Sequence, residues 1–207
     1  MANSITVIDY GMGNIGSVLN ALHYLGSNPK VSSDPSEVAQ AESLLLPGVG
    51  SFRKAMLKLR QTGLDQAILD AVQAKGRKIL GICLGMQLMG SSGSEDGDTP
   101  GLGLIPNPVD RFKPEEIGEN KIPHIGFNLV YSRPDAYLFR GLPPASDFYF
   151  VHSYRMLQQG LSGKTATCMY GTEFLAAYEH NNIYATQFHP EKSQTNGLLL
   201  LNNFLAQ

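Results

Sequence analysis

The twelve residues from Lys78 to Met89, KILGICLGMQLM, limit the possible folds of this chain more than any other stretch. Residues 79–82 are apolar and largely β-branched, which predicts a short buried strand, and the residues after Cys83 favour a helix. Between the two lies Gly81-Ile82-Cys83-Leu84-Gly85, with the pattern G-x-C-x-G. This pattern is the cysteine form of a nucleophile elbow, a tight turn from a strand into a helix.

The elbow pattern predicts a reactive position for Cys83. Glycines flank the cysteine because a Cβ atom would clash in so crowded a turn. The turn raises the sulfur at the head of the sheet and at a helix N-terminus, where the helix dipole favours thiolate over thiol. The backbone N–H of Leu84 then points to where an oxyanion would form. A free cysteine is also often only a small buried hydrophobic residue, so both interpretations stay open on this pattern alone.

Strands alternate with helices on the N-terminal side of the elbow, and mostly strands follow it. We expect strands at 5–8, 29–31, 44–46, 79–82, 103–105, 148–154, 166–170, 174–178 and 183–188, and helices at 15–25, 64–74 and 195–205, with others beginning after Asp34 and Ser51. Residues 91–103 are small and acidic and predict a loop. The fold class is therefore α/β, with one open, mostly parallel, flavodoxin-like sheet, helices on both faces and an antiparallel extension.

Length and composition exclude several classes of protein. The 207 residues fit one domain spanning 1–207, large enough to bury a core without disulfides. A net charge of −2 without any basic run argues against binding to nucleic acid or attachment to a membrane. Two cysteines and no C-x-x-C or H-E-x-x-H pattern predict neither a metal nor another cofactor. With no signal-peptide pattern and no membrane-length apolar run, we expect a cytoplasmic protein.

A glycine-rich stretch, Gly11-Met12-Gly13-Asn14-Ile15-Gly16, matches G-x-G-x-x-G after a strand and before a helix. Asp34 lies about twenty residues further on, so the spacing is that of a dinucleotide-binding fingerprint. A single match has low specificity, and Asp34 followed by Pro35 also forms a typical helix start. A dinucleotide-binding module that uses Gly11 to Gly16 is therefore one alternative function.

A second turn, Pro47-Gly48-Val49-Gly50, follows the third expected strand. In an open α/β sheet this turn lies beside the turn that carries Cys83. Backbone N–H groups of Val49 or Gly50 could then join that of Leu84 in a two-donor oxyanion hole. Alone the sequence indicates only a tight turn, but beside an elbow cysteine we favour the oxyanion hole.

The stretch Gln187-Phe188-His189-Pro190-Glu191 supplies a candidate base. His189 ends an apolar strand, and Pro190 restricts it to extended geometry. Side chains two residues apart on an extended chain point to the same side, so Glu191 is expected to hold the imidazole Nδ1–H and leave Nε2 facing a thiol. Cys83, His189 and Glu191 then form a cysteine-nucleophile triad.

These motifs together resemble those of the class I, or triad, glutamine amidotransferases, and within them the glutaminase subunits of imidazole glycerol phosphate synthases. The resemblance covers nearly the whole chain. The motifs that carry it are DYGMGNIGSV at 9–18, LLPGVGSF at 45–52, GICLGMQLM at 81–89, GLGLIP at 101–106, KIPHIGFN at 121–128, FVHSYR at 150–155 and QFHPEKSQ at 187–194. The elbow and HPE motifs are shared by the whole class, and the remaining motifs indicate the narrower group.

The resemblance implies a mechanism. Cys83 attacks the glutamine carboxamide, His189 moves the protons and Glu191 orients His189, so that a γ-glutamyl thioester forms and is hydrolysed to glutamate, with ammonia released. It also implies an oxyanion hole from Leu84 with Val49 or Gly50. The residues expected to hold glutamine by resemblance are Gly50, Gln87, Glu95, His152, Ser153 and Tyr154.

The resemblance also implies a partner, because family members deliver ammonia to a (β/α)₈-barrel cyclase. There it reacts with a formimino-carboxamide ribotide to give imidazole glycerol phosphate and an aminoimidazole carboxamide ribotide, in histidine biosynthesis. This chain contains no such barrel, so we expect a heterodimer with a separate cyclase. The residues expected to face it are Asn14, Pro123, His124 and Phe127. The family usually has tryptophan where this chain has Phe127. A class I glutaminase of another synthase is the alternative within the class.

Overall fold

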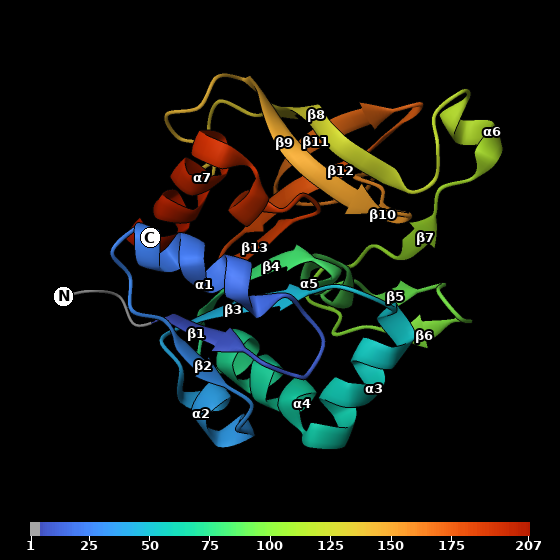
Figure 1. Ribbon diagram of the computed structural model, residues 1–207. Helices are drawn as coiled ribbons and strands as arrows, with labels where there is room; N and C mark the ends of the chain where they lie inside the picture. Colours follow the sequence, from blue (N-terminus) through green and yellow to red (C-terminus); the bar gives the residue numbers. More distant parts are fainter. Residues whose placement is uncertain (1–4) are drawn as a thin grey trace.

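The computed structural model describes residues 5–207 and is built around a nine-stranded sheet, in the order β2-β1-β3-β4-β13-β12-β11-β8-β9 (Figure 1). The parallel part contains β1 (Ile5–Ile8), β2 (Lys30–Ser32), β3 (Ser43–Gly48), β4 (Lys78–Cys83) and β13 (Ile183–Thr186). The antiparallel part adds β12 (Thr172–His180), β11 (Lys164–Tyr170), β8 (His124–Ser132) and β9 (Ala145–His152). This arrangement confirms the predicted α/β sheet with an antiparallel extension.

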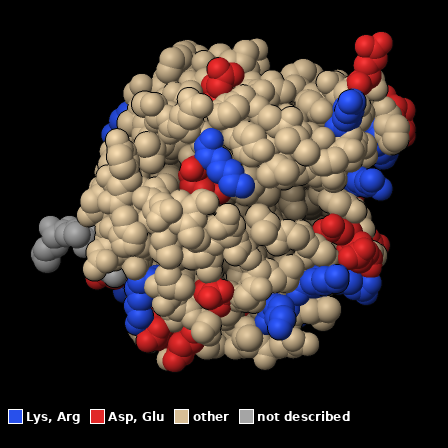
Figure 2. Space-filling view, in the orientation of Figure 1, with Lys and Arg blue, Asp and Glu red and all other residues tan. Residues whose placement is uncertain are grey.

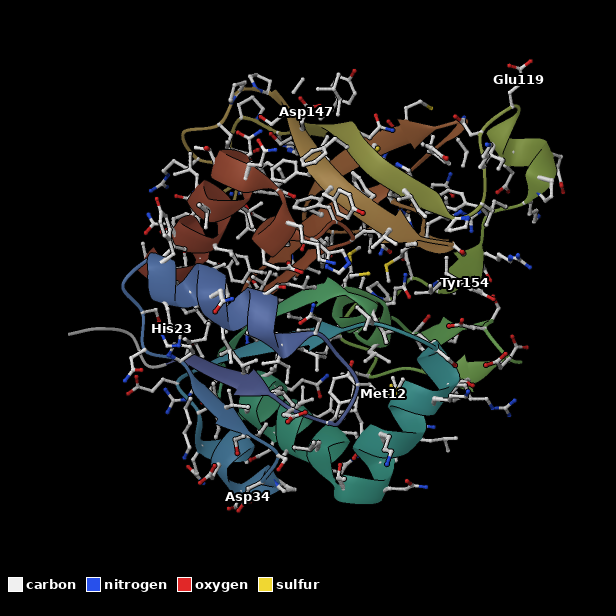
Figure 3. The ribbon with its side chains drawn as sticks, viewed as in Figure 1. Met12, His23, Asp34, Glu119, Asp147 and Tyr154 are labelled. Atoms are coloured by element: carbon white, nitrogen blue, oxygen red, sulfur yellow. The ribbon has the colours of Figure 1, made fainter. Side chains whose placement is uncertain are left out.

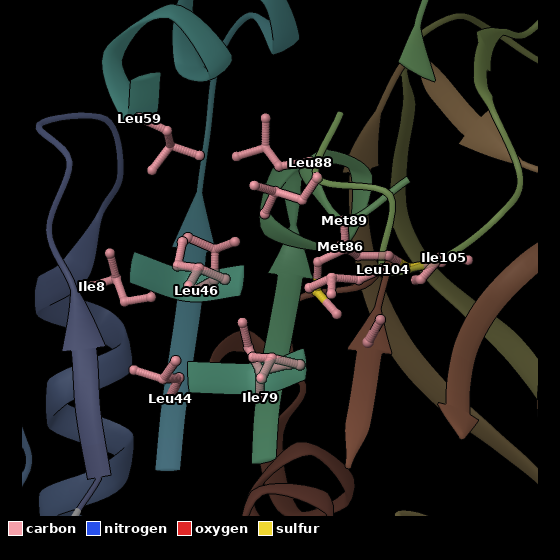
Figure 4. Close-up of a cluster of buried hydrophobic side chains, with 14 of the residues drawn as sticks. Ile8, Leu44, Leu46, Leu59, Ile79, Met86, Leu88, Met89, Leu104 and Ile105 are labelled. Atoms are coloured by element: carbon pink, nitrogen blue, oxygen red, sulfur yellow. The ribbon is translucent and has the colours of Figure 1, made fainter. Parts of the chain in front are cut away.

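Helices cover both faces of the parallel part, as predicted. On one face lie α1 (Ile15–Tyr24) and α7 (Gln194–Ala206), and on the other lie α2 (Pro35–Gln40), α3 (Phe52–Thr62) and α4 (Leu64–Leu69), which continues as the π-turn η1 (Asp70–Ala74) (Figure 1). Successive residues of a strand point alternately to the two faces of the sheet. Leu44 and Leu46 pack with the α3 side, where Figure 4 shows them, whereas Leu45 packs with the α1 side.

Two helix starts that were expected from single polar residues are present. The Asp34 carboxylate accepts a hydrogen bond from the backbone N–H of Ser36 at 2.8 Å and starts α2. The Ser51 hydroxyl accepts one from Lys54 N–H at 3.4 Å and starts α3. Each satisfies one of the N–H groups that a helix leaves unpaired at its first turn.

The C-terminal half departs from the prediction in several places. The expected strand at 103–105 is wrong, because Leu104 and Ile105 enter the core from an irregular segment. The expected strand at 148–154 divides at Ser153 into β9 and β10 (Tyr154–Met156). A small second sheet, β10-β7-β5-β6, joins β10 to strands inside and after the expected loop. Its other strands are β5 (Ser92–Gly93), β6 (Thr99–Pro100) and β7 (Val109–Arg111), and α6 (Pro114–Ile117) follows.

The longest element that the sequence patterns do not predict is β8, which pairs with β9 along its length. The third strand is also longer than expected, since β3 continues through Pro47 to Gly48, the register partner of Cys83.

No helix within residues 5–207 is long and apolar enough to cross a membrane. The same part of the chain holds no group of three or more His, Cys, Asp or Glu side chains placed to bind a metal ion.

Candidate active site

Cys83 lies at the junction of β4 and the short helix α5 (Leu84–Leu88), in the strained geometry expected of an elbow. Its φ of 53° and ψ of −109° are rarely adopted by a residue with a side chain. A Cβ atom on Gly85 would lie 1.7 Å from the Leu46 carbonyl oxygen, and one on Gly81 would lie 2.8 Å from the Met86 nitrogen. Both flanking glycines are therefore required for the close approach of β4, α5 and β3.

His189 and Glu191 form the expected pair, although by a different local geometry. His189 Nδ1 lies 2.7 Å from Glu191 Oε1, and both side chains are buried. His189 is extended, as the following Pro190 requires, but Glu191 belongs to the 3₁₀ turn η2 (Pro190–Lys192). The expectation of an extended chain on both sides of Pro190 is therefore wrong. The turn still brings the carboxylate to Nδ1, so Nε2 is the nitrogen left for other chemistry.

The second ring nitrogen of His189 has no hydrogen-bond partner among residues 5–207 and is fully buried. Burial lowers the pKa of His189, but the adjacent Cys83 sulfur and the Glu191 carboxylate outweigh it and raise the pKa to about 10. The surroundings therefore favour an imidazolium beside the cysteine. A buried histidine that is oriented by a carboxylate and has one free nitrogen can accept and return a proton.

A cavity of about 420 Å³ opens at Cys83. It is lined by Val49, Gly50, Ser51, Cys83, Leu84, Gln87, Glu95, Pro123, Val151, His152, Ser153 and Tyr154. All the residues proposed for the oxyanion hole and for glutamine binding are in this set, although they come from separate stretches of the chain. Figure 2 shows a hollow on the molecular surface, between the upper part of the view, which holds β8 and β9 in Figure 1, and the lower part, which holds α3 and α4. The volume suits a small polar substrate.

Gln87 and Gln187 form a chain of hydrogen bonds that ends at the sulfur of Cys83. The Gln87 amide nitrogen donates to the Tyr154 carbonyl at 3.1 Å and to Gln187 Oε1 at 3.0 Å. The Gln187 amide nitrogen in turn lies 3.7 Å from Cys83 Sγ. Gln187 is a site residue that the sequence reasoning missed. The usable signal is its place directly after β13, whose parallel pairing with β4 brings it beside Cys83.

His152 lines the cavity, but both of its ring nitrogens are occupied. Its Nδ1–H donates to the Tyr154 carbonyl at 2.7 Å, so Nε2 is left to accept from His124 Nδ1–H at 3.1 Å. Burial lowers the pKa of His124 to about 4 and that of His152 to about 3, so both rings are neutral at pH 7. His152 is therefore a wall residue, as expected, and not a second base.

Glu95 reaches the cavity from the segment at 91–103 that the sequence predicts as a loop. Its carboxylate accepts a hydrogen bond from Phe52 N–H, at the first residue of α3, over 2.7 Å. A carboxylate at this position accepts one of the N–H groups that a helix leaves unpaired at its first turn. Glu95 thus presents a carboxylate held in place at the cavity, which suits the ammonium group of an amino acid.

The four residues expected to face a partner divide into two groups. Asn14 and Pro123 are exposed, and Phe127 is 50% exposed on β8. His124, in contrast, is 2% exposed and stacks on Tyr170 with ring centroids 3.9 Å apart. This corrects the expectation for His124, because alternation along β8 turns its side chain inward while its neighbours face outward.

The glycine-rich loop that suggested dinucleotide binding packs against the turn after β3. A Cβ atom on Gly13 would lie 3.7 Å from Gly48 Cα, and one on Gly50 would lie 3.2 Å from Met12 Cε. Figure 3 labels Met12 in this loop. The loop therefore supports the rim of the cavity at Val49 and Gly50.

Comparison with known proteins agrees with this geometry. A sequence model of the family described as "Glutamine amidotransferase class-I" matches residues 6–207. The chain belongs to the class I glutamine amidotransferases. It is thus an enzyme of this class, and the resemblance seen in its motifs is confirmed.

Curated relatives show which members of the class this chain is similar to. The chain is 47% identical over 201 residues to "Imidazole glycerol phosphate synthase subunit HisH" of Moorella thermoacetica, which covers 97% of this chain and 93% of the relative. It is 46% identical over 203 residues to the protein of the same name from Syntrophotalea carbinolica, covering 97% of this chain and 98% of the relative.

Solved structures share the fold at low sequence identity. The structure titled "Structure of PurLQS from Thermotoga maritima" matches with a TM-score of 0.74 at 15% identity and covers 100% of this chain and 99% of that one. A second one, titled "Crystal structure of glutamine amidotransferase", matches with a TM-score of 0.74 at 18% identity and covers 97% of both chains. These likenesses support the fold class alone.

Proposed function

We propose that this chain is the glutaminase subunit of an imidazole glycerol phosphate synthase, and that it supplies ammonia to a separate (β/α)₈-barrel cyclase in histidine biosynthesis. One observation carries the chemistry. A carboxylate-oriented histidine with a free Nε2 lies beside an elbow cysteine, at a cavity of about 420 Å³. The 46–47% identity to two subunits named HisH supports the narrower choice over other class I enzymes.

In the proposed first half-reaction, the Cys83 thiol proton has already passed to His189 Nε2 to give the imidazolium described above, and the sulfur bonds to the side-chain amide carbon of glutamine. The carbonyl π electrons move to oxygen, and the N–H groups of Leu84 and of Val49 or Gly50 stabilise the oxyanion. His189 then protonates the amide nitrogen. The C–N bond breaks, ammonia leaves, and a γ-glutamyl thioester remains on Cys83.

In the second half-reaction, water attacks the thioester carbon and gives its proton to His189 Nε2. The resulting oxyanion occupies the same hole. When it collapses, the C–S bond breaks, the sulfur leaves beside the protonated His189, and glutamate is released, which restores the starting pair. Glu191 holds the ring in the orientation that both proton transfers need, and Glu95 binds the α-ammonium group of the substrate.

The test of the function is glutamate release from glutamine, measured with and without the barrel cyclase and its ribotide ligand. We expect a low rate for the chain alone and a large rise when both are added. A high rate that the cyclase leaves unchanged would support the triad but point to a free glutaminase or another synthase. The absence of any release under all conditions would overturn the glutaminase assignment.

Replacing Glu191 with glutamine is expected to lower glutamine hydrolysis by about 10³- to 10⁴-fold. The amide cannot enforce the tautomer with hydrogen on Nδ1, and it removes the charge that raises the pKa of His189. Because the pKa falls, the imidazolium is lost at lower pH, so the alkaline limb of the pH–rate profile moves to lower pH. Glu173→Gln, the same change at an exposed position of β12, serves as the control and should leave both rate and profile unaltered.

The partner surface follows from the outward side chains of β8. Ile125, Phe127, Leu129 and Tyr131 alternate along the strand and are all exposed, and we call them the β8 face. Met169, exposed on the neighbouring β11, extends the face. A contiguous apolar surface of this kind is typical of a docking site. Pro123 joins the face to the cavity rim, so a cyclase bound there would reach the site of ammonia release.

Replacing Phe127 with aspartate is expected to weaken binding of the cyclase by about 2 kcal/mol, or about thirtyfold in Kd. The change puts a charge where an aromatic ring would be buried. Calorimetric titration of the cyclase measures the effect. Tyr24→Asp removes another exposed ring, on α1, and should bind normally. Equal Kd values for the Phe127 variant and the unchanged chain would exclude the β8 face as the docking surface.

A further inference from the structure

Tyr10, in the loop after β1, carries a buried hydroxyl group that the proposed mechanism does not use. The residue is 4% exposed, and its oxygen has no hydrogen-bond partner within residues 5–207. A buried hydroxyl without a partner destabilises a fold, and phenylalanine would fill the same space without that cost. Its presence calls for a physical explanation.

The hydroxyl lies against the turn that is proposed to supply the oxyanion hole. A Cβ atom on Gly48 would lie 2.1 Å from the Tyr10 oxygen, so only glycine at position 48 allows this contact. Gly48 is the register partner of Cys83 across β3 and β4, and Val49 and Gly50 follow it directly. The Tyr10 oxygen is thus next to the backbone that leads into the proposed oxyanion donors.

Val49 and Gly50 line the cavity, whereas Tyr10 does not. Met12, two residues after Tyr10, packs against Gly50, so the loop supports the turn at both ends. A hydrogen bond from Tyr10 would therefore act on the turn and not on a substrate in the cavity.

The hydroxyl is a donor throughout the working pH range. Burial and then the nearby charges of Cys83 and Asp9 raise the pKa of Tyr10 far above its ordinary value. The group therefore stays protonated, and the acceptors within the adjacent turn are backbone carbonyl oxygens. In a planar trans peptide, the carbonyl and the following N–H point in opposite directions. A carbonyl turned toward Tyr10 therefore directs the next N–H away from Tyr10, and the N–H groups concerned belong to Val49 and Gly50, which line the cavity.

We propose that Tyr10 is a positioning residue for the oxyanion hole: its hydroxyl donates to the carbonyl of Gly48 or Val49 when the turn takes its catalytic arrangement, and so aims the N–H of Val49 or Gly50 at the oxyanion. The inference rests on the proposed glutaminase function. In the arrangement seen here the hydroxyl has no acceptor among the described residues. The bond forms only in the catalytic arrangement, so it contributes to kcat and not to the stability of this state.

The test is Tyr10→Phe, which removes only the oxygen. We expect a kcat for glutamine hydrolysis about tenfold lower in the presence of the cyclase and its ligand, with KM for glutamine unchanged and a melting temperature equal to or above that of the unchanged chain. A packing role would instead lower the melting temperature and leave kcat alone. Tyr178→Phe, the same change at another buried tyrosine of the same core cluster, is the matched control and should keep the normal kcat.

Two outcomes would overturn the inference without affecting the proposed function. One is a normal kcat for the Tyr10 variant, and the other is an equal loss of kcat in the Tyr178 variant. If the unchanged chain releases no glutamate even with cyclase and ligand present, the proposed function itself fails. The two failures are thus distinguished by the unchanged chain, which is measured in the same assay.

Discussion

Cys83→Ala is expected to reduce glutamine hydrolysis by at least about 10⁴-fold while the protein stays folded. Without the sulfur no thioester can form, and the remaining groups cannot replace a nucleophile. The side chain is small, lies beside His189, and makes long hydrogen-bond contacts to the Val151 carbonyl at 3.9 Å and the Gln187 amide at 3.7 Å. Its loss therefore leaves the elbow and the β8 face in place.

Three measurements distinguish a loss of catalysis from a loss of cyclase binding. Glutamate release should disappear, whereas the variant should bind the cyclase normally and an ammonium salt should still support the cyclase reaction. Cys168→Ala is the matched control, because this second cysteine is buried on β11 and burial raises the pKa of its thiol to about 12. Near-normal turnover by the Cys83 variant would disprove the nucleophile assignment.

Local steric rules explain why the elbow is predictable from the sequence. The pattern around Cys83 requires glycine on both sides, and each glycine indeed faces a backbone atom at a distance that no Cβ could occupy. The pairing of His189 with Glu191 can also be predicted from the sequence, because the two residues are only two positions apart. Extended geometry alone does not explain it, since a 3₁₀ turn brings the carboxylate to the ring.

The strand β8 shows where pattern-based prediction fails. A strand is normally recognised by apolar residues on the buried side, but β8 exposes Ile125, Phe127 and Leu129 and buries His124. An apolar outward face is expected where a partner will cover it, and one chain contains no information on what covers it. Its inward histidine is satisfied by His152, 28 residues away, which no local pattern indicates.

Gln187 illustrates a second limit. Its amide bridges Gln87 and Cys83, which are 100 and 104 residues away in the sequence. A single glutamine has no periodicity, and its role depends on the parallel pairing of β13 with β4. Buried polar networks of this kind become visible only when the strand order is known.

Gly85→Ala is expected to have the largest effect on stability, lowering the free energy of unfolding by more than about 4 kcal/mol. The added Cβ would lie 1.7 Å from the Leu46 carbonyl oxygen and 2.8 Å from the Leu46 carbonyl carbon. These are backbone atoms of a central strand, so no side-chain rotation relieves the overlap. Either β3 or α5 must move, and both lead into walls of the cavity. Urea unfolding of the chain alone measures the loss.

The matched control is Gly16→Ala in α1. Within residues 5–207, the nearest atom to a Cβ there would be the Asn14 side-chain oxygen at 3.6 Å, which is ordinary contact. Because alanine is a better helix former than glycine, this variant should be more stable by about 0.5–1 kcal/mol. If Gly85→Ala lowers the free energy of unfolding and Gly16→Ala raises it, the loss of stability comes from the elbow and not from replacing a glycine as such. If both variants unfolded at the same urea concentration, the close approach of β4, α5 and β3 would not be what requires glycine beside Cys83.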